Sequence, residues 1–344
     1  MDHSYAFHPV KVAKVDLALE NKSLKAEVEH LKRLIEKLHM TERFGIQRFA
    51  SSDKDIRFFT RFASYDLLMS FWAFIEPSLP FMTDVKQAQR DTFAEPITLE
   101  AHSLQPIDEL FMFLNYLALG SKQCDLAHRF DVQLSTVSWI ITTWSNFLYI
   151  VLGSVRIWMP EEEILEHLPA EFKDYENTTV ILDCAKLRCQ CPSSPLFQRA
   201  VSPTSKSQCT LKGLFGVAPH GAVTFISPLY AGSISNKQII RESGILSLLR
   251  PGMAIMVNKG LLVDDNELKN IYRPSDFPNK SWTNASLRVL MTRLTQRVKD
   301  HKFFDSEIPP WLLGNINQLY SVACLLTNYE NGPLLNAYRS KETK

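Results

Sequence analysis

TTVILDC (residues 178–184) and LKGLFGVAPHGAVTFISPL (residues 211–229) are the two stretches that decide the fold of this chain. The first is apolar and rich in β-branched residues, and the second holds two apolar runs on either side of His220-Gly221. Runs of this kind predict strands, and a short break with glycine between two of them predicts a hairpin. Asp183 lies at the end of the first predicted strand, so the sheet carries a carboxylate there.

The residues after the hairpin extend this pattern. A helix is expected from about residue 235 to 249, followed by the apolar strand MAIMVN at 253–258. Near the end, apolar residues repeat at helical spacing, namely Leu287, Leu290, Met291, Leu294 and Val298. Strands mixed with helices in this order predict an α/β domain over residues 175–335, with a mixed sheet and flanking helices.

The preceding part, residues 44–150, is expected to be helical. Within 107–149, the apolar run IDELFMFLNYLALG leads to a helix near residues 122–129, a turn at Phe130-Asp131-Val132, and a second helix capped by Ser135. This spacing is the outline of a helix-turn-helix. The second helix has no Lys or Arg, so the alternative is a buried helix with Trp139 and Trp144 in the core. Residues 84–106 are polar and are expected to form a surface loop.

Residues 10–40 carry a seven-residue repeat that predicts a parallel two-stranded coiled coil. Leucine occupies the d positions and Asn, Val and Ile occupy the a positions, where the one Asn would set the register. The residues of the seam are Leu17, Asn21, Leu24, Val28, Leu31, Ile35 and Leu38. Glu20 and Glu27 can reach Lys25 and Lys32 of a partner helix. A homodimer is therefore expected, and the alternative is a single helix that docks on its own domain.

Composition limits the class of protein. The chain has 344 residues, of which 45% are hydrophobic and 22% charged, with a formal net charge of +1. Such a balance excludes a strongly basic DNA binder but allows a local basic patch. Six cysteines without a CxxC pair predict free thiols in a reducing compartment. The stretch 139–155 has no charge and approaches the length of a membrane span. Its polar residues and Gly153 favour a buried helix instead, so no membrane association is expected.

Several fragments resemble the DDE superfamily endonucleases of Harbinger-type transposons. They are SDKDIRFFTRFASY, LAHRFDVQLSTVSWIITTW, ILDCAKL, LKGLFGVAPHGAVTFISPLYAGSISNKQI, GMAIMVNKGL and ASLRVLMTRLTQRVK. The resemblance covers most of the chain and implies a ribonuclease-H-like fold. It also implies a site where three carboxylates hold two Mg²⁺ or Mn²⁺ ions for phosphoryl displacement. Related chains with such a zipper often carry a zinc-binding module before it, and no ligand spacing of that kind precedes this one.

The resemblance places the three acid positions at Asp183, Asn258 and Thr292. An amide and a hydroxyl do not offset the charge of two divalent ions as carboxylates do, so catalysis is expected to be lost. The expected cofactor is none, or Mg²⁺ or Mn²⁺ held weakly by Asp183. The alternative is a residual metal-dependent nuclease on DNA, in which Asp264, Asp265 or Glu267 supplies a missing carboxylate.

Weak DNA contact is expected from two places. The first is the start of the second helix of the helix-turn-helix, at Ser135, Thr136 and Ser138. The second is a basic run whose alternative is a plain solvated face: Arg288, Arg293, Arg297, Lys299 and Lys302, of which Arg293 and Arg297 are the DNA candidates. The resemblance implies a nuclear protein, with the cytosol as the alternative. The sequence thus predicts a non-catalytic, transposon-derived, dimeric nuclear binding module.

Overall fold

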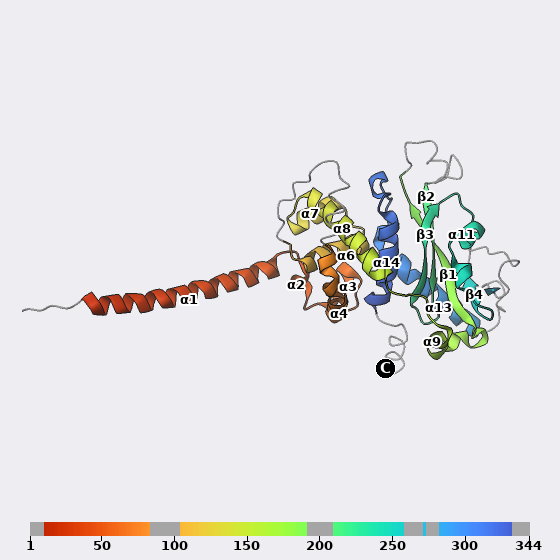
Figure 1. Cartoon of the computed structure of the whole chain (residues 1–344), viewed down its shortest axis with the longest axis horizontal. Coiled ribbons are helices and arrows are strands. Elements are labelled where there is room, and N and C mark those ends of the chain that lie inside the picture. Colours follow the sequence, from red (N-terminus) through yellow and green to blue (C-terminus); the bar gives the residue numbers. More distant parts are fainter. Residues whose placement is uncertain (1–9, 83–103, 191–208, 258–270, 273–281, 332–344) are drawn as a thin grey trace, which may run out of the picture.

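The computed structural model describes residues 10–82, 104–190, 209–257, 271–272 and 282–331 of the chain. Figure 1 shows three parts in sequence order: a long isolated helix, a group of helices, and a sheet with helices on both faces. The α/β class and the mixed sheet are confirmed, and a helical region precedes that sheet.

Five strands form one sheet in the order β3-β2-β1-β4-β5. β1 pairs antiparallel with β2 and parallel with β4, so the sheet is mixed. β2 also pairs antiparallel with β3, and β4 pairs parallel with β5. The strand bounds are β1 Thr178–Arg188, β2 Thr210–Val217, β3 Val223–Ala231, β4 Ala254–Val257 and β5 Ile271–Tyr272. The hairpin at His220-Gly221 is confirmed, with Gly221 at a φ of 105° that favours glycine.

Helices cover both faces of the sheet because side chains alternate along each strand. Val180 and Leu182 of β1 face the side covered by α11 (Asn236–Glu242) and α12 (Ile245–Leu248). Ile181, Ala185 and Leu187 belong to the larger core, which also holds α13 (Trp282–Lys299) and α14 (Ile316–Glu330). The single helix expected at 235–249 is two helices, because the chain turns at Gly244 with a φ of 81°.

The helical region contains the predicted helix-turn-helix. α7 (Gln123–Phe130) ends at Asp131, whose φ is 51°, and α8 (Leu134–Gly153) follows. The expected cap Ser135 is wrong, because α8 begins after Gln133 and has no side-chain cap. The other elements are α2 Ile46–Phe49, α3 Asp53–Thr60, α4 Tyr65–Ile75, η1 Glu76–Phe81, α6 Pro106–Leu119, α9 Glu161–Glu166, η2 Ala170–Tyr175, η3 Lys302–Asp305 and η4 Pro310–Leu312.

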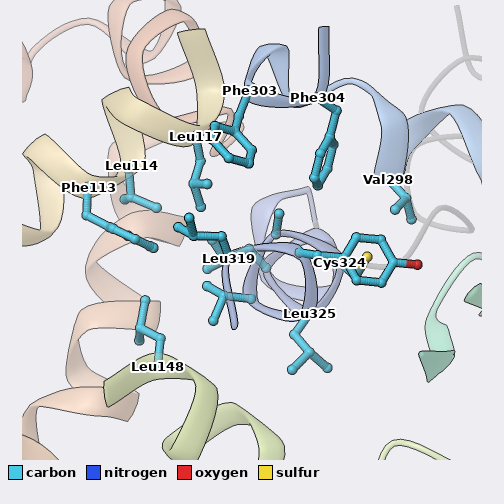
Figure 2. Close-up of a cluster of buried hydrophobic side chains, with 14 of the residues drawn as sticks. Phe113, Leu114, Leu117, Leu148, Val298, Phe303, Phe304, Leu319, Cys324 and Leu325 are labelled. Atoms are coloured by element: carbon cyan, nitrogen blue, oxygen red, sulfur yellow. The ribbon is translucent and has the colours of Figure 1, made fainter. Parts of the chain in front are cut away.

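α14 joins the helical region to the sheet. It packs against α4 and α8 on one side and against β3 on the other. Figure 2 shows Leu319 and Leu325 of α14 among Phe113 and Leu114 of α6 and Leu148 of α8. One hydrophobic core therefore runs through both regions.

α1 (Val10–Glu42) extends away from the other elements, and its main contact with them is at α2 (Figure 1). Four of the seam residues have described side chains that are about half exposed, with 56% for Leu17, 52% for Leu24, 48% for Val28 and 49% for Leu31. Docking of this face on the chain's own domain is thus absent for the described part of α1. The side chains of Ile35 and Leu38 lie outside the described residues.

Two further expectations are decided by the structure. α8 is long and apolar enough to cross a membrane, but most of it is buried in the protein, as expected for a core helix. The expectation that all thiols are free is wrong for Cys209, which is in a disulfide bond. Cys124, Cys184, Cys189 and Cys324 are free.

Candidate functional site

Asp183 lies in β1 on the face that α13 covers, and 7% of the residue is exposed. In the pairing of β1 with β2 it is opposite Phe215. The backbone N–H of Cys184 donates to Asp183 Oδ1 at 2.7 Å. The carboxylate expected from the sequence is therefore present and nearly buried, but it lies in the middle of β1 and not at its end, because the strand continues past Asp183 to Arg188.

Lys299, the last residue of α13, holds the other carboxylate oxygen. Its Nζ atom lies 2.6 Å from Asp183 Oδ2, a distance typical of a charge-assisted hydrogen bond. The ammonium also lies 5.8 Å from the centre of the Phe215 ring. Because Phe215 and Asp183 are opposite each other, one pair of strand positions provides both contacts.

The charges around Asp183 do not suit a pair of divalent ions. Burial, followed by the charge of Asp183, raises the pKa of the neighbouring Cys184 thiol, while Lys212, Lys299 and Lys186 act in the opposite direction. These lysines make the surroundings positive. Among the residues that the structure describes, no three His, Cys, Asp or Glu side chains gather as a metal site would need. The described residues at Asp183 therefore do not fit two Mg²⁺ or Mn²⁺ ions.

Of the other two expected acid positions, the structure describes only Thr292. Thr292 is exposed on α13, and its hydroxyl donates to the carbonyl oxygen of Arg288 at 2.9 Å. Lys299, two helical turns later, is the α13 residue that reaches the carboxylate. Asn258 lies outside the described residues, as do Asp264, Asp265 and Glu267.

The start of α8 offers less to DNA than the sequence suggested. Ser135 is exposed and Ser138 is partly exposed, but Thr136 is 7% exposed and faces the interior. Trp139 and Trp144 are buried, so the alternative of a core helix is right for most of α8. The Trp144 indole N–H donates to Glu109 Oε2 of α6 at 3.0 Å. Exposed groups next to the turn are Lys122, His128, Arg129 and Gln133.

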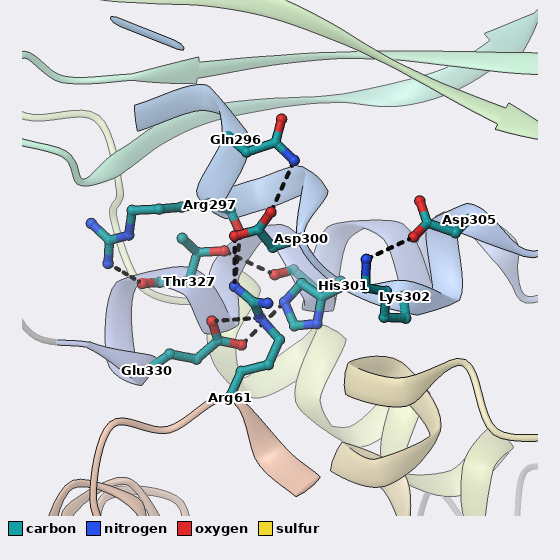
Figure 3. A network of polar contacts seen from close by, with 10 residues as sticks. Arg61, Gln296, Arg297, Asp300, His301, Lys302, Asp305, Thr327 and Glu330 are labelled. Carbon is teal, nitrogen blue, oxygen red and sulfur yellow. Dashed lines mark hydrogen bonds and ion pairs between the residues drawn. The ribbon is translucent and has the colours of Figure 1, made fainter. Parts of the chain in front are cut away.

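The basic run on α13 is not a free DNA-binding face. Arg297 points into the structure, where its guanidinium donates to the carbonyl oxygen of Thr327 at 3.1 Å (Figure 3). It also donates to the carbonyl oxygen of Gly221 at 3.3 Å. Lys299 is bound to Asp183, and Lys302 pairs with Asp305 at 3.1 Å. Arg293 alone of the two DNA candidates on this helix is exposed. The interpretation of Arg297 as a DNA contact is therefore not supported.

Sequence reasoning missed three residues of a buried polar cluster shown in Figure 3. Glu330 of α14 is fully buried, and Arg61 and His301 lie against it. Lys299 was noticed only as part of a basic run. Asp183 and Lys299 lie 116 residues apart in the sequence and Arg61 and Glu330 lie 269 apart, so neither spacing nor composition indicates these two pairs.

Comparison with known families agrees with this arrangement. Residues 182–328, from the middle of β1 to α14, match the family model described as DDE superfamily endonuclease. Residues 102–154, which contain α6, α7 and α8, match the helix-turn-helix of DDE superfamily endonuclease. No curated protein and no solved structure matches the chain. The chain therefore carries a DDE superfamily endonuclease-like domain and the helix-turn-helix of that superfamily, which indicates a transposase-derived protein.

Proposed function

We propose that this is a Harbinger-type, transposon-derived protein that no longer cleaves DNA and acts as a dimeric binding module in the nucleus. The observation that carries the loss of cleavage is the ion pair between Asp183 and Lys299. A carboxylate paired with an internal cation at 2.6 Å offers little charge to metal ions or to a phosphoryl group. The mixed sheet with Asp183 on its central strand supports a ribonuclease-H-like origin for the domain.

Dimerisation is supported by α1. Its leucine face is exposed in the single chain, and an isolated helix gains little stability in water without a partner. A second copy would bury Leu17, Leu24 and Leu31 against their own equivalents. The body of the chain could then present two helix-turn-helix regions to one DNA duplex.

DNA contact is proposed for the exposed edge beside the turn between α7 and α8. Lys122 and Ser135 are exposed there, and the first N–H groups of α8 lack side-chain caps. Helix N-termini and lysines bind phosphate without reading sequence. Binding should therefore be weak, salt-dependent and strengthened by the second copy.

The first experiment is a nicking assay on supercoiled and transposon-end DNA with Mg²⁺ or Mn²⁺. We expect no nicking above the level of Asp183→Asn. Nicking by the wild-type chain that disappears in Asp183→Asn would overturn the loss of cleavage and favour a residual nuclease.

The second experiment is sedimentation velocity at micromolar concentration. We expect a dimer for the wild-type chain and a monomer for the double change Leu24→Ala and Leu31→Ala, since each buried Leu→Ala change costs roughly 2–5 kcal/mol. A matched control changes Leu19, which is exposed but outside the a and d positions, to Ala and should leave the dimer intact. A monomeric wild-type chain would contradict the proposal. Imaging of a tagged chain in cells tests the nuclear location.

A further inference from the structure

We propose that the Lys299 ammonium is a built-in counter-ion that takes the place of a divalent cation at Asp183. The inference rests on the proposed loss of cleavage and gives it a cause in this chain's own residues. The lysine does more than leave the site incomplete: it excludes a metal ion from the one carboxylate that remains on β1.

Both carboxylate oxygens of Asp183 already have a described partner. Oδ2 accepts from Lys299 Nζ at 2.6 Å, and Oδ1 accepts from the backbone N–H of Cys184 at 2.7 Å. Mg²⁺ binds oxygen at roughly 2.1 Å and keeps several of its waters in an octahedral shell. An ion bound to Oδ2 would place that shell against the ammonium, and the two cations would repel each other.

Lys299 is held where it is by more than the carboxylate. Its ammonium lies near the face of the Phe215 ring, where a cation is attracted to the π electrons. About a third of its side chain is exposed, so the stem is largely packed. Lys299 also ends α13, and the last turn of a helix favours a positive side chain. The cation is therefore in place before any ligand arrives.

The neighbouring charges act in the same direction. Lys186 and Lys212 are opposite each other in the pairing of β1 with β2, and both lie close enough to influence the Cys184 thiol. Lys212 Nζ donates to the carbonyl oxygen of Ile234 at 2.7 Å, so it is fixed nearby. A divalent ion at Asp183 would thus have Lys299 beside it and two further lysines on the opposite face of the sheet.

The test is Mn²⁺ binding by electron paramagnetic resonance on the full chain, without DNA. Four proteins are compared: wild type, Lys299→Met, Asp183→Asn, and the double variant. Methionine keeps the length of the stem and removes the charge. Because Asp264 and Asp265 supply carboxylates elsewhere in the chain, the readout is the difference that Asp183→Asn makes in each background.

In the wild-type background, we expect the same Mn²⁺ affinity with or without Asp183. In the Lys299→Met background, we expect Asp183 to add a site that binds at least about tenfold more tightly than the double variant, since a repelling charge is gone. Lys302→Met is the matched control, because Lys302 pairs with a different carboxylate, that of Asp305, and should leave Mn²⁺ binding unchanged. Circular dichroism confirms that each variant is folded.

Two results would overturn the proposal. One is a wild-type chain whose Mn²⁺ affinity drops on Asp183→Asn, since the lysine would then not exclude the ion. The other is a folded Lys299→Met protein that gains no Asp183-dependent site. Neither outcome decides whether DNA is nicked. The nicking assay can fail or succeed independently, so the failure of this proposal and that of the proposed function remain distinguishable.

Discussion

The Nε atom of Arg61 lies 3.3 Å from Oε2 of Glu330, and this ion pair joins the helical region to the last helix of the endonuclease-like domain (Figure 3). The backbone strengthens the same junction, because the N–H of Ala63 donates to the carbonyl oxygen of Glu330 at 2.7 Å. His301 Nε2 lies 3.1 Å from Glu330 Oε1, although the angle is not that of a hydrogen bond. The buried side chain of Glu330 therefore lies at the junction of the two regions.

Glu330→Gln should destabilise the chain strongly. It removes the negative charge that Arg61 faces inside the protein, and breaking one side of a buried pair costs roughly 3–5 kcal/mol. Urea unfolding measures the loss. Asp305→Asn is the control, because its pair with Lys302 is about two-thirds exposed and such pairs contribute roughly 0–1 kcal/mol. Equal small losses for the two variants would show that the junction does not depend on this charge.

His220 should make stability depend on pH. Burial, followed by the charge of His167, lowers the pKa of His220 to about 4. An unfolded histidine has a pKa of about 6.5, so protonation favours the unfolded chain. The contribution of neutral His220 to the free energy of unfolding is therefore complete above about pH 6.5, and it is lost as the pH falls toward 4. With about 1.4 kcal/mol for each pKa unit, the total is about 3 kcal/mol.

The measurement is the free energy of unfolding of wild type and His220→Gln at several pH values between 7 and 4. The variant should lose less stability than wild type over this range. His128, which is exposed on α7, gives the control His128→Gln, whose pH dependence should follow wild type. Parallel curves for wild type and His220→Gln would rule out this role.

Gly213 should not tolerate a side chain. A Cβ atom there would lie 2.5 Å from Cζ of the fully buried Tyr320, closer than real contacts. Gly213→Ala should therefore cost roughly 1–3 kcal/mol, as overpacking does. Gly153→Ala is the matched control, since a Cβ there meets nothing within 4 Å and alanine favours the helix by about 0.5–1 kcal/mol. Gly213→Ala should lower the midpoint of thermal unfolding, and Gly153→Ala should not.

Asn21 should control how many chains associate through α1. In the single chain its side-chain amide donates to the carbonyl oxygen of Leu17 at 3.0 Å, and the residue is exposed on the helix surface. Asn21→Val places a β-branched residue in the seam and should give a tighter assembly. The loss of the polar pair should also admit larger oligomers beside the dimer. Sedimentation equilibrium measures both changes, and an unchanged monomer would contradict the coiled coil.

Local patterns predicted much of the fold. The strand that carries Asp183, the hairpin at His220-Gly221 and the helix pair around Asp131 each follow from a few adjacent residues. Where a local rule failed, a neighbouring residue decided the outcome. Gly244 interrupts the helix expected at 235–249, and Gln133 precedes α8 where Ser135 was expected.

The candidate site was predicted only in part. Asp183 was predicted because an acid directly after an apolar run is conspicuous, although the strand continues beyond it to Arg188. Lys299 was not predicted, because its partner Asp183 lies 116 residues away and a lysine in a basic helix normally points to solvent. Arg297 was misread for the same reason, because its carbonyl partners belong to a turn and to α14. Contacts of this kind depend on how elements meet in space.

The position of α14 affects how the chain folds as it is made. Its buried residues complete the core of helices that leave the ribosome much earlier, such as α4 and α8. Until residues 316–330 emerge, Phe113, Leu114 and Leu148 lack the helix that covers them. The helical region therefore keeps apolar surface exposed until α14 has been made, and such transient exposure makes a nascent chain prone to aggregate.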